Sequence, residues 1–237
     1  MNTWTIFKRE LTSYFTQPTA YAIVVIFGFL STLLAFTLGN FWGIGDASLY
    51  GSFFRFHPLL LMILVPAVSM RQWSDEHATG TIELLGTFPI KLRSAILGKF
   101  LASSVVWFVA LLLTFPIVWA VIYLGEPDTW TILSGYICTF LAITTLVSAF
   151  TRDQVVALIA SVAICCFLTI CGWEPVINEI RRSGSTNAVN IMTDLGIYSH
   201  FFDTTLGLIR ATSLIYFFGL ITVCLVGTNM VLKSQRA

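Results

Sequence analysis

Long apolar segments alternate with short polar connections along most of this chain. Six of the apolar segments approach the length of about 20 residues that crosses about 30 Å of hydrocarbon. They cover residues 19–42, 50–70, 100–124, 131–150, 155–173 and 211–232. In the second segment the uncharged core is short, so Arg55 must extend its side chain to the membrane surface. The pattern predicts an all-α integral membrane protein with six transmembrane helices, forming one domain over 1–237.

The N-terminal segment 2–17 has a different pattern. Its aromatic and aliphatic residues recur at helical spacing, whereas Lys8, Arg9 and Glu10 fall largely on the other side. This pattern favours an interfacial helix that lies on the membrane surface and ends near Gln17 and Pro18. A frayed polar terminus is the alternative.

Composition and charge support a membrane location. The chain is 57% hydrophobic and 11% charged, and its mean hydropathy is +0.85. A net charge of +1 gives no reason to expect nucleic acid as a partner. Of the 13 Lys and Arg residues, nine fall on one side of the six predicted spans and four on the other. The nine are Lys8, Arg9, Arg71, Lys91, Arg93, Lys99, Arg152, Lys233 and Arg236, and the four are Arg55, Arg181, Arg182 and Arg210. The positive-inside rule therefore predicts that both termini are cytoplasmic.

Two connections are longer than a turn requires, the cytoplasmic one over 71–99 and the external one over 174–210. The external connection contains a semi-apolar stretch, 191–209, that is too interrupted to cross the membrane. We expect a re-entrant or surface helix there.

The sequence offers little chemistry of its own. The centres of all six predicted spans lack Asp, Glu, Lys, Arg and His, which argues against an ion-coupled transporter. His57, His77 and His200 are far apart, and the five cysteines are expected to be packing residues. No phosphate-binding loop is present, because Gly98-Lys99 is followed by Phe100. We therefore expect no catalytic, metal or cofactor residue, and any ATP and Mg²⁺ must be bound by another polypeptide.

A polar stretch, 70–89, stands between the second and third predicted spans. Arg71, Asp75 and Glu76 extend the second span into the cytoplasm, and Gly80-Thr81 is suited to end one helix or start another.

Beyond Gly80 the pattern becomes amphipathic. Glu83 falls in the favourable first turn of a helix, Ile82 and Leu85 give it an apolar face, and Pro89 stops it. We interpret this as a docking helix that fits a groove on a cytoplasmic partner. An ordinary solvated loop with interfacial anchors is the alternative.

Two motifs resemble a known family. Met70-Arg71-x-Trp73-x-Asp75-Glu76-x-x-x-Gly80-Thr81-Ile82-Glu83-Leu84-Leu85-x-Thr87-x-Pro89 resembles the signature connector of type-2 ABC exporter permeases, which include drug, polysaccharide and gliding-motility permeases. Tyr198-Ser199-His200-Phe201-Phe202 with Gly207-Leu208-Ile209, leading into Tyr216, resembles the region before the sixth helix in the gliding-motility-associated subgroup. Asp75 stands where that subgroup often has Glu.

The resemblance implies an N-terminal elbow helix, a coupling helix around 81–88, and re-entrant helices between spans five and six. The implied ATPase-coupling residues are Arg71, Asp75, Glu76, Gly80, Thr81, Glu83, Leu84, Leu85 and Pro89, with Arg152 and Asp153 in a lesser cytoplasmic contact at 151–154. The implied external re-entrant residues are His200, Phe201, Phe202 and Gly207.

The implied partners are two copies of a cytoplasmic ABC ATPase subunit and a second permease copy or paralogue in the cell inner membrane. Membrane lipids are further partners, and so is a periplasmic or extracellular protein if the motion is transmitted mechanically. Two other classes stay open at this point: a membrane-embedded enzyme or scaffold without an ATPase, and an ion-coupled carrier. The sequence does not identify a cargo.

Overall fold

The computed structural model describes residues 3–37, 56–81, 92–113, 130–182, 186–205 and 211–234. These residues form α-helices and no strand, which confirms the all-α prediction for this part of the chain. The helices are α1 (Thr3–Thr16), α2 (Pro18–Thr37), α5 (His57–Ser69), α6 (Arg71–Ala78), α8 (Leu92–Leu113), α10 (Trp130–Phe150), α11 (Gln154–Cys171), α12 (Glu174–Arg182), α13 (Thr186–Leu195), α14 (Ile197–Thr205) and α15 (Ala211–Ser234).

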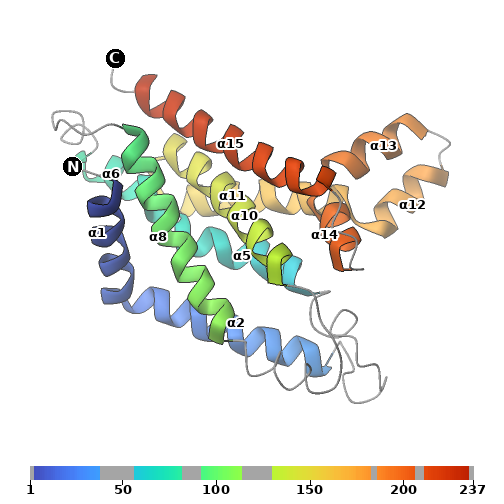
Figure 1. Cartoon of the computed structure of the whole chain (residues 1–237), viewed down its shortest axis with the longest axis horizontal. Coiled ribbons are helices and arrows are strands. Elements are labelled where there is room, and N and C mark those ends of the chain that lie inside the picture. Colours follow the sequence, from blue (N-terminus) through green and yellow to red (C-terminus); the bar gives the residue numbers. More distant parts are fainter. Residues whose placement is uncertain are drawn as a thin grey trace.

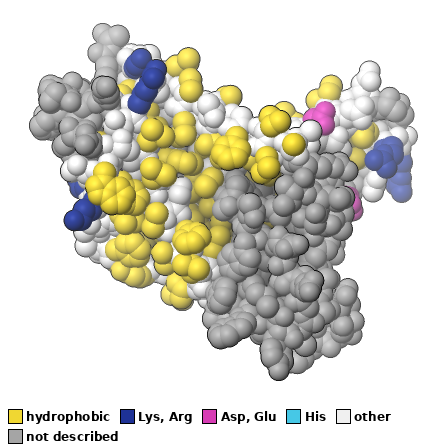
Figure 2. Space-filling model, in the orientation of Figure 1, with side chains coloured by type: hydrophobic (Ala, Val, Ile, Leu, Met, Phe, Trp, Pro, Cys, Tyr) yellow, Lys and Arg dark blue, Asp and Glu magenta, His cyan; other side chains and the backbone are white. Residues whose placement is uncertain are grey.

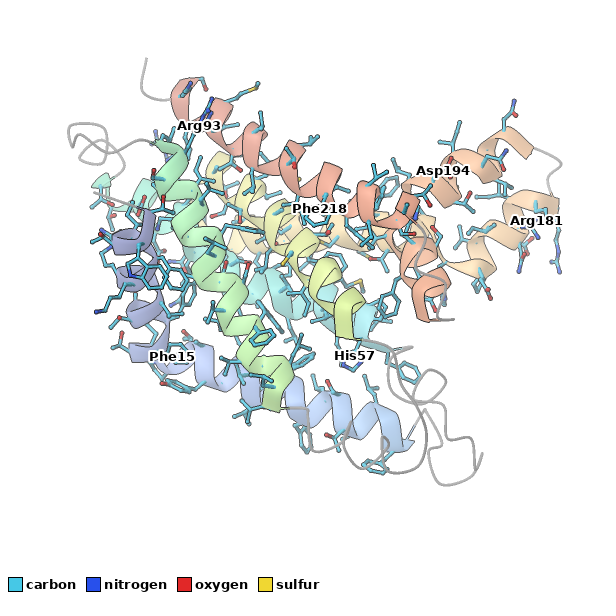
Figure 3. All side chains as sticks on the ribbon, viewed as in Figure 1. Phe15, His57, Arg93, Arg181, Asp194 and Phe218 are labelled. Atoms are coloured by element: carbon cyan, nitrogen blue, oxygen red, sulfur yellow. The ribbon has the colours of Figure 1, made fainter. Side chains whose placement is uncertain are left out.

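The helices pack side by side, with short helices at both ends of the bundle (Figure 1). The start of α1, the end of α15 and α6 lie at one end, and α12 and α13 lie at the other (Figure 1). Arg93 and Arg181 mark these opposite ends in Figure 3. The elements on each side of the predicted membrane therefore group together in space.

α10 is the central helix. It packs against α15, α11, α5, α6, α8 and α14. From Ile137 to Ala149 nearly all its side chains are buried, as expected for a helix enclosed on every side. Many of them are small, and the Thr144 and Thr145 hydroxyls donate to the carbonyls of Phe140 and Leu141 at 2.8 and 2.7 Å. Small, internally bonded side chains let neighbouring helices approach α10 closely.

The described helices overlap the predicted segments, and α8 extends beyond its predicted start. α8 begins at Leu92, eight residues before the predicted span at 100. Leu92, Ala95 and Ile96 are buried together with Ile6 of α1, so apolar packing continues the helix toward its N-terminus. At Gly98 a Cβ atom would lie 3.0 Å from the Ile6 side chain. This close approach keeps α1 against α8.

The helices differ in their fitness to cross a membrane. Among the described residues, α8, α11 and α15 are long and apolar enough, and the pair α1–α2, bent by 72°, adds a fourth candidate. α5 has only 13 residues, short of the length of about 20 that a span requires. The predicted helix over 2–17 is present as α1, and the 72° bend separates it from α2.

Hydrophobic side chains gather on the described surface between the two ends. In Figure 2 they gather between Lys and Arg side chains at both extremes of the visible face. α11 and α15 contribute large exposed residues, including Phe167 at 60% and Phe218 at 70%. Exposed apolar surface of this extent suits contact with lipid chains. Aromatic residues Trp4, Phe15 and Tyr21 are exposed around α1 and its junction with α2, as in an interfacial belt.

α13 and α14 are fastened to the end of α11 by two glycines. A Cβ atom at Gly172 would lie 2.6 Å from the Ser199 backbone nitrogen, and one at Gly196 would overlap the Cα atom of Gly172. The backbones meet with no room for a side chain. Within the semi-apolar stretch, residues 191–195 and 197–205 are thus helical and pack on the bundle.

Gly172→Ala is expected to lower the free energy of unfolding by about 1–3 kcal/mol, because the added methyl group must displace the α14 backbone. The matched control is Gly219→Ala, since a Cβ atom there meets nothing within 4 Å. Thermal unfolding in detergent micelles, followed by circular dichroism, measures both. Equal melting temperatures for the two variants would contradict the close approach.

Candidate functional site

The polar stretch begins where α5 passes into α6, and Ser148 of α10 braces this junction. The Ser148 hydroxyl donates to the Met70 carbonyl at 2.9 Å and accepts from the N–H groups of Trp73 and Ser74 at 3.0 and 3.2 Å. Pro66 lies one turn before the junction and lacks an N–H group, which weakens the helix there. A side chain from another helix therefore satisfies backbone groups around the break.

Gln72 links α6 to two more helices. Its amide nitrogen donates to the Ser103 hydroxyl of α8 at 2.7 Å, and its amide oxygen accepts from the Thr145 hydroxyl of α10 at 2.8 Å. All three side chains are buried. Because an unpaired buried amide is costly, this network holds α6 in one orientation.

The most unusual feature is a buried cation, Lys99 of α8. Its side chain is only 5% exposed, and its ammonium lies 2.9 Å from Glu76 of α6 and 3.3 Å from Glu10 of α1. The ammonium also lies 5.3 Å from the ring centroid of the fully buried Trp73. One charge thus joins three helices. A buried charge is tolerated only when paired in this way.

Glu10 is held ionised by its neighbours. Burial pushes its pKa up, but the Lys99 ammonium and the Arg9 guanidinium outweigh that effect and hold the pKa below its usual value. Arg9 contacts Glu10 at 2.6 Å. The helical pattern predicts that Glu10 lies on the polar side of the helix, and its side chain is only 16% exposed there. The helical spacing was right, but it did not reveal a buried cation facing the polar side.

α6 also contacts the connection between α10 and α11. His77 Nε2 lies 3.1 Å from the Ala149 carbonyl, and the Gln154 amide donates to the Asp75 carboxylate. The structure therefore brings the predicted contact region 151–154 against α6. Within it, Asp153 caps α11 by accepting from the Val155 N–H at 2.9 Å, and Arg152 is exposed.

α6 ends at Ala78, and Gly80, just after the C-cap residue Thr79, has φ of +68°. This left-handed conformation after the last turn is the usual glycine ending of a helix. The Thr81 hydroxyl lies 3.0 Å from that of Thr79. Gly80 thus sets the direction in which the chain leaves α6.

The remaining coupling residues, Glu83, Leu84, Leu85 and Pro89, lie outside the described residues, so the docking helix stays a prediction. The predicted external residues are only partly covered. His200 and Phe201 lie in α14, the Phe202 side chain is not described, and Gly207 falls outside the described ranges.

His200 of α14 joins this helix to α13 and α15. Its ring stacks on Tyr216 of α15 with centroids 4.3 Å apart. Nδ1 lies 3.2 Å from the Ser213 hydroxyl and Nε2 lies 3.1 Å from the Asp194 carbonyl. These contacts fasten α13 and α14 to α15. Among the described residues no group of three or more His, Cys, Asp or Glu could hold a metal ion.

Sequence reasoning did not single out Lys99, Glu10, Gln72 or Ser148 as parts of the site. One signal was available. Lys99 lies among apolar residues, one helical turn after Ala95 and Ile96, and such a lysine must either reach water or find a carboxylate.

Lys99→Met is expected to lower the free energy of unfolding by about 3–5 kcal/mol, because it leaves Glu10 and Glu76 without their shared cation. The control is Arg182→Met, which breaks the exposed pair with Glu179 and is worth less than about 1 kcal/mol. The measurement is the melting temperature of each variant in detergent micelles, compared with that of the wild type. Equal small losses would mean that the Lys99 cluster contributes no more than a surface pair.

The stability difference between wild type and Glu10→Gln is expected to depend on pH. Since the folded pKa of Glu10 is lowered, its contribution is complete above the ordinary carboxyl pKa and is lost as the pH falls through the lowered value. Unfolding measured from about pH 7 to about pH 3 should therefore show the two proteins converging in acid. A difference that stays constant with pH would contradict the pairing.

A comparison with protein families places this arrangement in context. The family model described as ABC-2 family transporter protein matches residues 54–232, which run from before α5 into the last turns of α15. No curated protein gives a significant match. The match covers well over half of the chain and includes the whole of α6 with its contacts on α8, α10 and α11. The protein therefore belongs to the ABC-2 family of transporter proteins, as a multi-pass membrane protein and the permease component of an ABC transporter.

Proposed function

We propose that this chain is the six-span permease subunit of an ATP-driven exporter, and that α6 with the segment after it transmits motion from a separate cytoplasmic ATPase. The observation that carries the proposal is the anchoring of α6. This helix contacts α8, α10 and α11 directly, and Lys99 links it to α1.

Such anchoring is what a transmitting element needs. A push on a helix held only by its ends would bend the connection and leave the spans in place. α6 is instead held along its length, by Gln72, Trp73 and Glu76. Packed interfaces with few alternative arrangements pass on displacements as rigid-body shifts.

The membrane placement follows from charge. α6, the start of α1 and the end of α15 share one end of the molecule, and α12 with Arg181 lies at the other (Figures 1 and 3). The end with α6 carries the larger share of Lys and Arg in the sequence, so we assign it to the cytoplasm. The six-span layout adds α5 and α10 to the helices that qualify by length and hydropathy, since both pack within the bundle.

ATP must come from another chain, because the sequence has no phosphate-binding loop. Two ATPase subunits and a second permease, identical or paralogous, complete the proposed assembly, with ATP and Mg²⁺ on the ATPases. The buried polar groups of α10 are hydroxyls, such as Thr139 and Thr144. An interior of this kind suits an amphipathic or lipid-like cargo, or mechanical transmission to a periplasmic partner through α12, α13 and α14.

Gly80→Pro and Glu83→Arg are each expected to lower the amount of ATPase that co-purifies with the permease by roughly tenfold or more. Proline fixes φ near −65° and cannot adopt the +68° of Gly80. Glu83→Arg places a positive charge opposite the basic group of the partner that is expected to contact Glu83. Both variants should still insert, because both positions lie outside the predicted spans.

The measurement is pull-down of the co-expressed ATPase together with its ATP hydrolysis rate. Glu179→Arg, an exposed reversal at the opposite end, is the matched control and should change neither. The proposal is wrong if no ATPase is retained by the wild type, or if hydrolysis is indifferent to Glu83→Arg.

A further inference from the structure

A cavity of about 390 Å³ lies inside the bend between α1 and α2. α5 and α6 close it, and Lys99 of α8 reaches its wall. In the membrane placement proposed above, this cavity is at the level of the cytoplasmic headgroups, because α1 lies along that interface. The following inference rests on that placement but does not require the ATPase.

The lining of the cavity is divided by polarity. α1 and α6 contribute polar residues, among them Glu10, Asp75 and Glu76, whereas α2 and α5 contribute small or apolar residues such as Ala20, Ile23 and Ala67. The polar half therefore comes from the helices outside the spans and the apolar half from the spans themselves. An amphiphile with its headgroup toward α6 and its chains along α2 and α5 matches this division.

Not all charged atoms that line the cavity have a partner among the described residues. The lining holds three carboxylates and two cations. Lys99 forms ion pairs with both Glu10 and Glu76. The second carboxylate oxygen of Glu76, Oε2, is buried and has no hydrogen-bond partner in the part of the chain that the structure describes. A buried acceptor of this kind favours a charged donor from a ligand.

A cation on the same wall of the cavity can bind a negatively charged group of the same ligand. Arg71 lines the cavity and forms no ion pair with the other described residues. Guanidinium groups bind phosphate through two parallel hydrogen bonds. The cavity thus offers acidic acceptors for an ammonium and a guanidinium for a phosphate.

We propose that this cavity binds the headgroup of a zwitterionic phospholipid that carries a primary ammonium, as phosphatidylethanolamine does. The ammonium donates to Glu76 Oε2 and to Asp75, the phosphate accepts from Arg71, and the acyl chains follow α2 and α5. A trimethylammonium headgroup has no N–H to donate, and an anionic headgroup would meet three carboxylates. Phosphatidylcholine and phosphatidylglycerol are therefore poorer ligands.

The full-length protein is reconstituted in nanodiscs with equal amounts of phosphatidylethanolamine, phosphatidylcholine and phosphatidylglycerol, and the lipids retained after release are identified by native mass spectrometry. The wild type is expected to retain phosphatidylethanolamine over phosphatidylcholine by roughly tenfold, the value of one charge-assisted hydrogen bond. Glu76→Gln should bring the two close to equality.

Glu76 also pairs with Lys99, so Glu76→Gln could weaken the fold as well as remove the acceptor. A second variant therefore leaves all charges in place. Ala67→Phe fills the apolar half of the cavity and should abolish selective retention. Glu179→Gln at the external end and Ala163→Phe on the exposed side of α11 are the matched controls, and both should keep the wild-type preference.

Equal retention of phosphatidylethanolamine and phosphatidylcholine by the wild type would overturn the proposal, as would an unchanged preference in Ala67→Phe. Two other results would equally refute a lipid. Displacement by soluble glycerophosphoethanolamine at millimolar concentration, together with an unchanged preference in Ala67→Phe, would show that the acyl chains take no part in binding. Loss of the ATPase from Ala67→Phe, with lipid preference intact, would show that a protein side chain enters.

Discussion

A lysine ammonium buried in a largely apolar bundle must be neutralised, and much of this structure follows from that requirement at Lys99. Its side chain is 5% exposed, so desolvation would expel it without Glu10 and Glu76. The two carboxylates come from different helices, and the pairing therefore fixes α1 and α6 against α8. α1 cannot lie freely along the membrane surface, and α6 cannot turn, without separating charges in a region of low dielectric.

The sequence predicted the all-α class because apolar runs and proline stops are local signals. Pro18 separates α1 from α2, and Gly80 follows the end of α6, through backbone chemistry alone. Lys99 was beyond such reasoning. A charge at the edge of an apolar run indicates the end of a span. Only the packing of α1 on α8 shows that Lys99 pairs with Glu10.

The same limit applies to the junction of α5 and α6. Ser148 looks like one small residue in an apolar segment, yet its hydroxyl contacts three backbone groups around Met70. Serine and threonine hydroxyls can bond to their own helix and so enter a span at little cost. Periodicity therefore cannot tell which of them also serves another helix, as Ser148 does and as Thr145 does for Gln72.

These contacts set an order in which motion at α6 must reach the rest of the bundle. The carboxylate of Glu76 is bound to α8, but the backbone around Met70 and the amide of Gln72 are bound to α10. α10 in turn packs against α11, α15 and α14. A shift of α6 must therefore carry α10 with it or break the bonds of Ser148 and Thr145. Since α10 is enclosed from Ile137 to Ala149, this part has no free surface along which to slide, and its displacement moves its neighbours as well. The helices α13 and α14, tied to α11 through Gly172 and to α15 through His200, lie at the far end of that path.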